Sequence, residues 1–166
     1  WGQILPLFFG TDAAVANYAE GGESANTSIK ANRLKKALSQ MKKGDYLFIE
    51  FGHNDQKQKG PGKGAYYSFM TNLKIYIDEV KAHGGIPVLV TPTRRRRFDK
   101  EGKTVNTHGE YPDAVRWIAN KEKVLLIDLN EMTGILYEAL GEKESKKAFV
   151  HYPMGSFEGQ KKALAD

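Results

Sequence analysis

Two short polar clusters in the sequence carry groups that can present hydrogen-bond donors to a ligand. Gly52, His53, Asn54 and Asp55 directly follow an apolar run, where the Asn54 amide and the His53 ring can face a ligand. Residues 20–24 read Glu-Gly-Gly-Glu-Ser. Glycine permits a positive φ and a close approach of a backbone N–H to a ligand oxygen, which an oxyanion-binding donor requires. Each cluster alone has a plainer interpretation, namely a helix cap or tight turn for the first and an ordinary turn for the second.

Alternating strands and helices must position these clusters. Apolar, β-branched or aromatic runs predict strands at residues 15–19, 46–51, 87–91 and 124–129. Helical periodicity predicts helices at residues 29–41, 66–83, 111–120 and 131–140. We expect Asn26, Thr27 or Ser28 to cap the first helix.

The predicted strands indicate the fold class. Residues 47–49 and 88–90 are continuously apolar, which is typical of a parallel sheet that is covered on both faces. The sequence therefore predicts an α/β protein with three α/β/α layers and a parallel sheet. In such sheets ligands bind beyond the carboxyl ends of the strands, and both polar clusters follow a predicted strand.

Length and composition exclude several classes of protein. The 166 residues suffice for one domain, and 40% hydrophobic with 27% charged residues is a globular composition. The absence of cysteine excludes disulfides, thiolate nucleophiles and cysteine-ligated metals in this chain. The longest apolar stretches, residues 4–9 and 46–49, fall far below the ~20 residues of a membrane span, so we expect no membrane role. The formal charge of +5 is modest, and we expect no nucleic-acid partner.

Taken together, the clusters resemble the second and third sequence blocks of SGNH (GDSL-type) hydrolases. The similarity lies in residues 17–24 (Asn-Tyr-Ala-Glu-Gly-Gly-Glu-Ser), in Gly44-Asp45-Tyr46 and in residues 50–55 (Glu-Phe-Gly-His-Asn-Asp). The similarity is closest to the rhamnogalacturonan acetylesterase branch. Softer matches are Trp1-Gly2-Gln3, Val90-Thr91-Pro92, residues 107–112 and residues 149–153.

The resemblance implies a fold, a reaction and three site residues. Members of that family have an α/β/α domain with a five-stranded parallel sheet and remove acyl groups from sugars through a Ser-His-Asp triad. Gly22 matches the glycine whose N–H donates to the oxyanion, and Asn54 matches the asparagine whose amide does the same. Asp166 matches the first residue of the closing Asp-x-x-His. The serine would precede Trp1 and the histidine would follow Asp166, so we interpret residues 1–166 as a single SGNH hydrolase domain that is incomplete at both ends and lacks its first strand.

The expected function is therefore that of a carbohydrate O-acetylesterase. Its substrate would be acetylated pectic rhamnogalacturonan or a related oligosaccharide, cleaved by serine acyl transfer to water without a metal or organic cofactor. Two alternatives stay open. A non-catalytic carbohydrate- or polyanion-binding module would use the run Arg94 to Arg97, and an SGNH lipase or thioesterase would have an apolar groove beside Asn54.

Other polar residues in the chain have competing interpretations. Ser24 with His53 or His108 could form a nucleophile pair, although we favour none within this chain. His108 and Glu110 form a His-x-Glu pair, but the cysteine ligands of a zinc deaminase are absent. The four arginines 94–97 either meet the carboxylates of an acidic polysaccharide or lie in a solvated loop, and we favour the loop.

Overall fold

The computed structural model describes residues 2–149, 154–156 and 158–159. The helices in this part of the chain are α1 (Ala25–Lys30), α2 (Arg33–Leu38), α3 (Met70–Ala82), α4 (Tyr111–Glu122) and α5 (Leu129–Glu144). The strands are β1 (Tyr46–Glu50), β2 (Ile86–Val90) and β3 (Leu125–Ile127). Short 3₁₀ turns occur at Leu5–Phe8, Asp55–Lys57 and Ser145–Ala148, and a π-type turn at Ala65–Phe69 leads into α3.

The three strands described form one parallel sheet in the order β1-β2-β3. Phe48 pairs with Val88, and Val88 pairs with Leu125, so these residues lie side by side on one face of the sheet. The helix α3 lies between β1 and β2 in the sequence, and α4 lies between β2 and β3. The predicted α/β class with a parallel sheet is confirmed.

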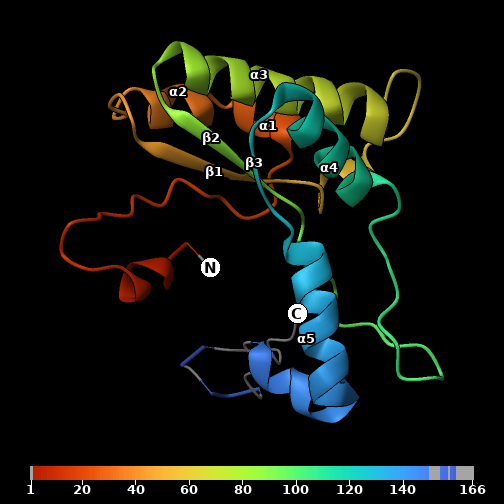
Figure 1. The fold of residues 1–166 in the computed structure, drawn as a ribbon. Helices are drawn as coiled ribbons and strands as arrows, with labels where there is room; N and C mark the ends of the chain where they lie inside the picture. The colour runs from red at the N-terminus through yellow and green to blue at the C-terminus, as the bar shows by residue number, and fades with distance from the viewer. Residues whose placement is uncertain (1, 150–153, 157, 160–166) are drawn as a thin grey trace.

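Helices α1 to α4 lie together on one face of the sheet (Figure 1). Buried side chains of the sheet and of the helices form one core there: Ile49, Leu89, Leu73, Ile77, Val80, Val115 and Ile118. On the opposite face Tyr46 and Leu125 remain 57% and 53% exposed. Helix α5 begins two residues after β3 and runs away from the sheet on that side (Figure 1).

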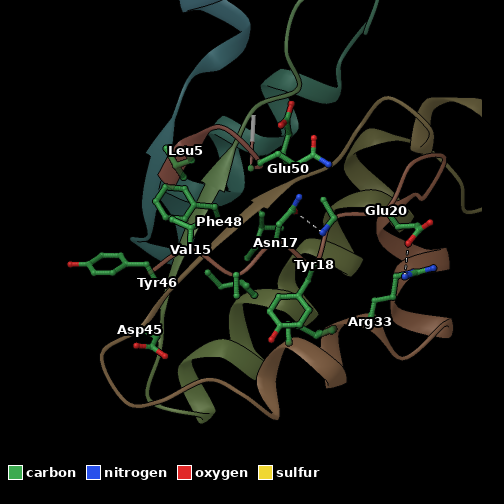
Figure 2. Close-up of a pocket in the computed structure, with 18 of the residues that line it drawn as sticks. Leu5, Val15, Asn17, Tyr18, Glu20, Arg33, Asp45, Tyr46, Phe48 and Glu50 are labelled. Atoms are coloured by element: carbon green, nitrogen blue, oxygen red, sulfur yellow. Dashed lines mark hydrogen bonds and ion pairs between the residues drawn. The ribbon is translucent and has the colours of Figure 1, made fainter. Parts of the chain in front are cut away.

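Residues 15–19 do not form the predicted strand. Residues 13–20 are neither helix nor strand, and a cavity of about 1040 Å³ is lined both by them and by β1. Figure 2 shows Val15 and Asn17 on the segment and Tyr46 and Phe48 on β1, around this space. A strand requires hydrogen bonds to a neighbouring strand. The cavity lies between residues 13–20 and β1, so these residues do not pair with β1.

The predicted first helix is two helices, and its start was placed too late. Asn32 adopts a left-handed conformation with φ 57° and separates α1 from α2. Ser24, not a residue at 26–28, caps α1: its hydroxyl accepts from the Thr27 N–H at 3.1 Å, and the Thr27 hydroxyl accepts from the Ser24 N–H at 2.9 Å. This reciprocal pair is a capping box with threonine in the third position.

Helix α5 carries a row of exposed apolar side chains on its outer surface. Met132, Ile135, Leu136 and Leu140 are 58%, 62%, 47% and 41% exposed. The spacing of three and four residues puts them along one side of the helix. None of the helices described has the length and apolar content to cross a membrane.

Candidate functional site

Two loops meet beyond the carboxyl end of β1. We call residues 20–24, which precede α1, the glycine loop, and residues 52–55, which follow β1, the asparagine loop. The Asn54 Nδ2 donates to the Glu23 carbonyl at 3.2 Å. The Gln58 Nε2, just beyond the asparagine loop, donates to the Ser24 hydroxyl at 2.8 Å. The fold thus brings the loop of Gly22 against Asn54, although the two are more than thirty residues apart in the sequence.

The Asn54 amide is held from both ends. The Lys57 Nζ donates to its Oδ1 at 2.7 Å, which fixes the oxygen end and therefore the orientation of the amide. An amide nitrogen carries two hydrogens, and the bond to the Glu23 carbonyl uses one of them. The second N–H can donate to a ligand oxygen without breaking either contact.

Glycine is required in both loops by backbone conformation. Gly22 has φ 86° and Gly52 has φ 128°, values that residues with a Cβ rarely adopt. A Cβ added at Gly22 would meet no described atom within 4 Å, so the backbone is open to an approaching group. A Cβ at Gly52 would lie 3.0 Å from Cγ of Pro92, which follows β2.

Asp55, the last residue of the asparagine loop, links this loop to the residue that follows the glycine loop. It is only 4% exposed, and its carboxylate accepts from the Ala25 N–H through Oδ1 and from the Gly52 N–H through Oδ2, each at 3.0 Å. Burial raises the pKa of this carboxyl, and the two backbone N–H groups act in the opposite direction. From the sequence, Asp55 is only one member of a polar cluster. Its hydrogen bond to Ala25, thirty residues away, could not be predicted from the neighbouring residues.

The two histidines near the loops pack against each other. The rings of His53 and His108 meet edge to face with centroids 4.5 Å apart. Since a carbonyl can only accept, His108 donates through Nε2 to the Thr93 carbonyl at 3.0 Å. His108 is 1% exposed, and burial, followed by the charges of His53 and Arg95, lowers its pKa to about 4. Burial and then Arg95 and Lys57 also lower the pKa of His53.

Ser24 has the contacts of a helix cap. It is 2% exposed, and its hydroxyl interacts with the Thr27 N–H and with the Gln58 side chain. Among the residues described, these contacts place the Ser24 hydroxyl in the cap of α1. Among those residues, no group of three or more His, Asp or Glu side chains is arranged to hold a metal ion.

The arginine run is built into the fold, so the favoured interpretation as a solvated loop is wrong for most of it. Arg94 donates to the Asn130 side chain at 3.2 Å and to the Thr104 hydroxyl at 3.2 Å. Arg95 donates to the Thr107 hydroxyl at 3.1 Å, and Arg96 donates to the Glu142 carbonyl at 3.0 Å. These bonds tie the segment after β2 to α5 and to residues 104–107. Arg97 is the exposed member of the run.

The cavity beside β1 borders this site without including Asn54. It is lined by Glu20 and Gly21 of the glycine loop, and an ion pair between Glu20 and Arg33 at 3.0 Å lies at one side of it (Figure 2). Asn54 is not among the lining residues. The two-loop site and the cavity are therefore neighbours. Asp166, the third residue that the resemblance implied, lies outside the described residues.

Comparison with known proteins identifies the group to which the chain is related. Rhamnogalacturonan acetylesterase RhgT of Bacillus subtilis (strain 168) is 42% identical over 152 residues, which cover 92% of this chain and 65% of that protein. YesY of the same organism, named a probable rhamnogalacturonan acetylesterase, is 32% identical over 146 residues, which are 87% of this chain and 67% of YesY. The chain thus spans about two thirds of the length of these two relatives.

A solved structure and a family model agree with these relatives. The crystal structure of Bacillus subtilis YxiM superposes with a TM-score of 0.82 at 30% identity, covering 90% of this chain and 42% of YxiM. Residues 1–151 match the sequence model of the GDSL-like Lipase/Acylhydrolase family. The chain therefore belongs to the GDSL-like lipase/acylhydrolase (SGNH hydrolase) family, close to its rhamnogalacturonan acetylesterases.

Proposed function

We propose that the chain is part of a serine esterase that removes acetyl groups from pectic rhamnogalacturonan or a related oligosaccharide. The observation that carries the proposal is the contact between the glycine loop and the Asn54 amide at the carboxyl end of β1. Two kinds of N–H donor, a backbone one at Gly22 and a side-chain one at Asn54, then belong to one small site. The names of RhgT and YesY support the substrate class.

In the proposed reaction a serine outside these 166 residues gives its hydroxyl proton to the catalytic histidine and attacks the acetyl carbon, and an electron pair moves onto the carbonyl oxygen. The Gly22 N–H and the second Asn54 N–H donate to that oxygen, each stabilising the transition state by about 3 kcal/mol. The bond to the sugar oxygen then breaks, and this oxygen takes a proton from the catalytic histidine. Water hydrolyses the acetyl-serine by the same steps and releases acetate.

Asp166 has the third role in this proposal. Its carboxylate would accept a hydrogen bond from the catalytic histidine, keep that ring in the reactive tautomer and stabilise the imidazolium form. None of these steps requires a metal ion or an organic cofactor.

We also propose that residues 1–166 belong to one SGNH domain that continues at both ends and contains a further strand. The cavity of about 1040 Å³ between residues 13–20 and β1 supports this, because a strand there would bury the apolar side chains that line it. The full-length sequence tests the proposal directly. A Gly-Asp-Ser block before Trp1 and a histidine three residues after Asp166 are expected, and a full-length sequence with neither would contradict it.

The activity is tested on the full-length protein with p-nitrophenyl acetate and, as a second substrate, acetylated rhamnogalacturonan from pectin. Loss of one oxyanion donor in Asn54→Ala is expected to lower kcat by about 100-fold or more. Asn120→Ala is the matched control, because Asn120 is exposed near the end of α4 that lies away from the site. Wild-type protein that releases acetate from neither substrate, or an Asn54→Ala variant with the activity of Asn120→Ala, would contradict the assignment.

The alternative of a polyanion-binding module has less support than before. It depended on the arginine run together with the absence of the triad serine and histidine from residues 1–166, and three of the four arginines donate to groups within the fold. A guanidinium that already bonds to carbonyl and hydroxyl oxygens has fewer donors for a polysaccharide carboxylate.

A further inference from the structure

We propose that Asp55 is a positioning residue whose carboxylate clamps the glycine loop and the asparagine loop at a fixed separation. The catalytic consequence of this clamp rests on the proposed esterase function, whereas the clamp itself does not.

The two hydrogen bonds of Asp55 divide between the two loops. Oδ1 accepts the N–H of Ala25, the first residue of α1, which directly follows the glycine loop. Oδ2 accepts the N–H of Gly52, the first residue of the asparagine loop. Both distances are 3.0 Å. One rigid, planar group therefore sets the distance between the backbone at Ala25 and the backbone at Gly52. Ala25 lies three residues after Gly22, and Gly52 lies two residues before Asn54.

The surroundings of Asp55 favour this role over that of an ion-pair partner. The side chain is buried, and among the residues described no lysine, arginine or histidine forms a salt bridge with it. Its own carbonyl accepts from the Tyr111 hydroxyl at 3.2 Å, which anchors the asparagine loop to α4. The other links between the loops, from Asn54 and Gln58, come from side chains that are only partly buried.

Asparagine cannot replace this carboxylate, although it has nearly the same shape. One end of an amide is an NH₂ group, and it would face a backbone N–H in either orientation. One of the two loops must then move away from residue 55. Displacement of a reacting group by about 1 Å lowers the rate by roughly 100-fold. Movement of either loop would therefore weaken the binding of the transition state and lower kcat.

The kinetic test uses Asp55→Asn in the full-length protein, with p-nitrophenyl acetate as substrate. We expect kcat to fall by about 10- to 100-fold while KM changes by less than about threefold, because the loops hold the oxyanion and not the leaving group. Asp99→Asn is the matched control, since Asp99 also accepts two backbone N–H groups, those of Glu101 and Lys103, in an exposed turn. That variant is expected to keep the wild-type kcat.

A double-mutant cycle separates positioning from general destabilisation. If Asp55 acts through the oxyanion donors, Asp55→Asn should lower kcat much less in an Asn54→Ala background than in the wild type. The same factor in both backgrounds, or an unchanged kcat in the single variant, would overturn the proposal. A variant that only melts at a lower temperature, with wild-type kcat below the transition, would overturn it as well.

Amide hydrogen exchange tests the clamp without reference to activity. In the wild type the Ala25 and Gly52 amides should both exchange slowly, and in Asp55→Asn at least one should exchange at least about tenfold faster, with Leu89 of β2 as the internal reference. Wild-type exchange of either amide at the rate of an unstructured peptide refutes the clamp, even where the variant does not fold. A wild-type protein that has slow amides but no esterase activity refutes the proposed function and leaves the clamp standing.

Discussion

Replacement of Gly52 by alanine should destabilise the protein more than the same change at Gly44. Both glycines have a positive φ, 128° at Gly52 and 90° at Gly44, so alanine introduces backbone strain of about 1–3 kcal/mol at each. The two positions lie at opposite ends of β1. They differ in what a new methyl group meets: nothing within 4 Å at Gly44, but Cγ of Pro92 at 3.0 Å at Gly52.

The Pro92 ring has little freedom to move aside. Pro92 is almost fully buried, and its carbonyl accepts from the Asn130 side chain at 3.0 Å. Forcing a methyl group into such a contact costs a further ~1–3 kcal/mol. In a domain of this size each kcal/mol lowers Tm by about 2–4 °C, so Gly52→Ala should melt at least about 2 °C below Gly44→Ala.

The assay is thermal unfolding of the full-length protein and both variants, followed by far-ultraviolet circular dichroism. Urea unfolding at a fixed temperature checks that the difference appears in the midpoint with an unchanged slope. Equal stability of the two variants, or a lower Tm for Gly44→Ala, would show that the contact with Pro92 does not restrict residue 52.

Two further predictions concern the segments beside the site. Arg94→Lys should lower the free energy of unfolding by about 1–3 kcal/mol, because an ammonium group cannot reproduce the bonds to Asn130 and Thr104. Arg97→Lys, at an exposed position, should change the free energy of unfolding by less than about 0.5 kcal/mol. Equal effects of the two substitutions in urea unfolding would contradict the role of the Arg94 bonds. His108 has a pKa of about 4 in the folded protein against its ordinary 6.5, so the unfolded chain binds a proton that the folded protein does not between those values. Stability should therefore fall as the pH drops from 6.5 to 4, by up to about 3 kcal/mol from this residue, and His108→Gln should fall less steeply in a pH series of urea midpoints. A variant with the wild-type slope would refute the assignment to His108.

The sequence was a good guide where an element depends on its own residues. Strands β1 and β2 lie within one residue of the predicted limits, because their continuous apolar runs match burial in a parallel sheet. Helix α4 starts at the predicted Tyr111, with Pro112 in its first turn, where proline is tolerated. The loops that follow β1 and precede α1 were recognised because each follows a predicted strand, where ligands bind in parallel sheets, and because each resembles a sequence block of SGNH hydrolases.

The errors arise where structure depends on distant partners. Residues 15–19 have the composition of a strand, but no local pattern says whether a neighbour is present to pair with them. The periodicity of residues 29–41 continues across Asn32 because Leu34 and Leu38 of α2 pack into the same core as Ile29 of α1, which hides the break between the helices. The Asp55–Ala25 bond and the arginine contacts join residues ten to nearly fifty positions apart, and such separations lie beyond motif analysis.

The exposed apolar row on α5 affects how stability has to be measured. Fluorescent dyes such as 8-anilinonaphthalene-1-sulfonate emit strongly when they bind exposed apolar surface. Met132, Ile135, Leu136 and Leu140 offer such a surface in the folded chain. A dye-based melting experiment would therefore begin at a high signal and show a compressed transition. Loss of that initial signal in Ile135→Lys, with an unchanged circular dichroism melting curve, would trace the background fluorescence to this helix.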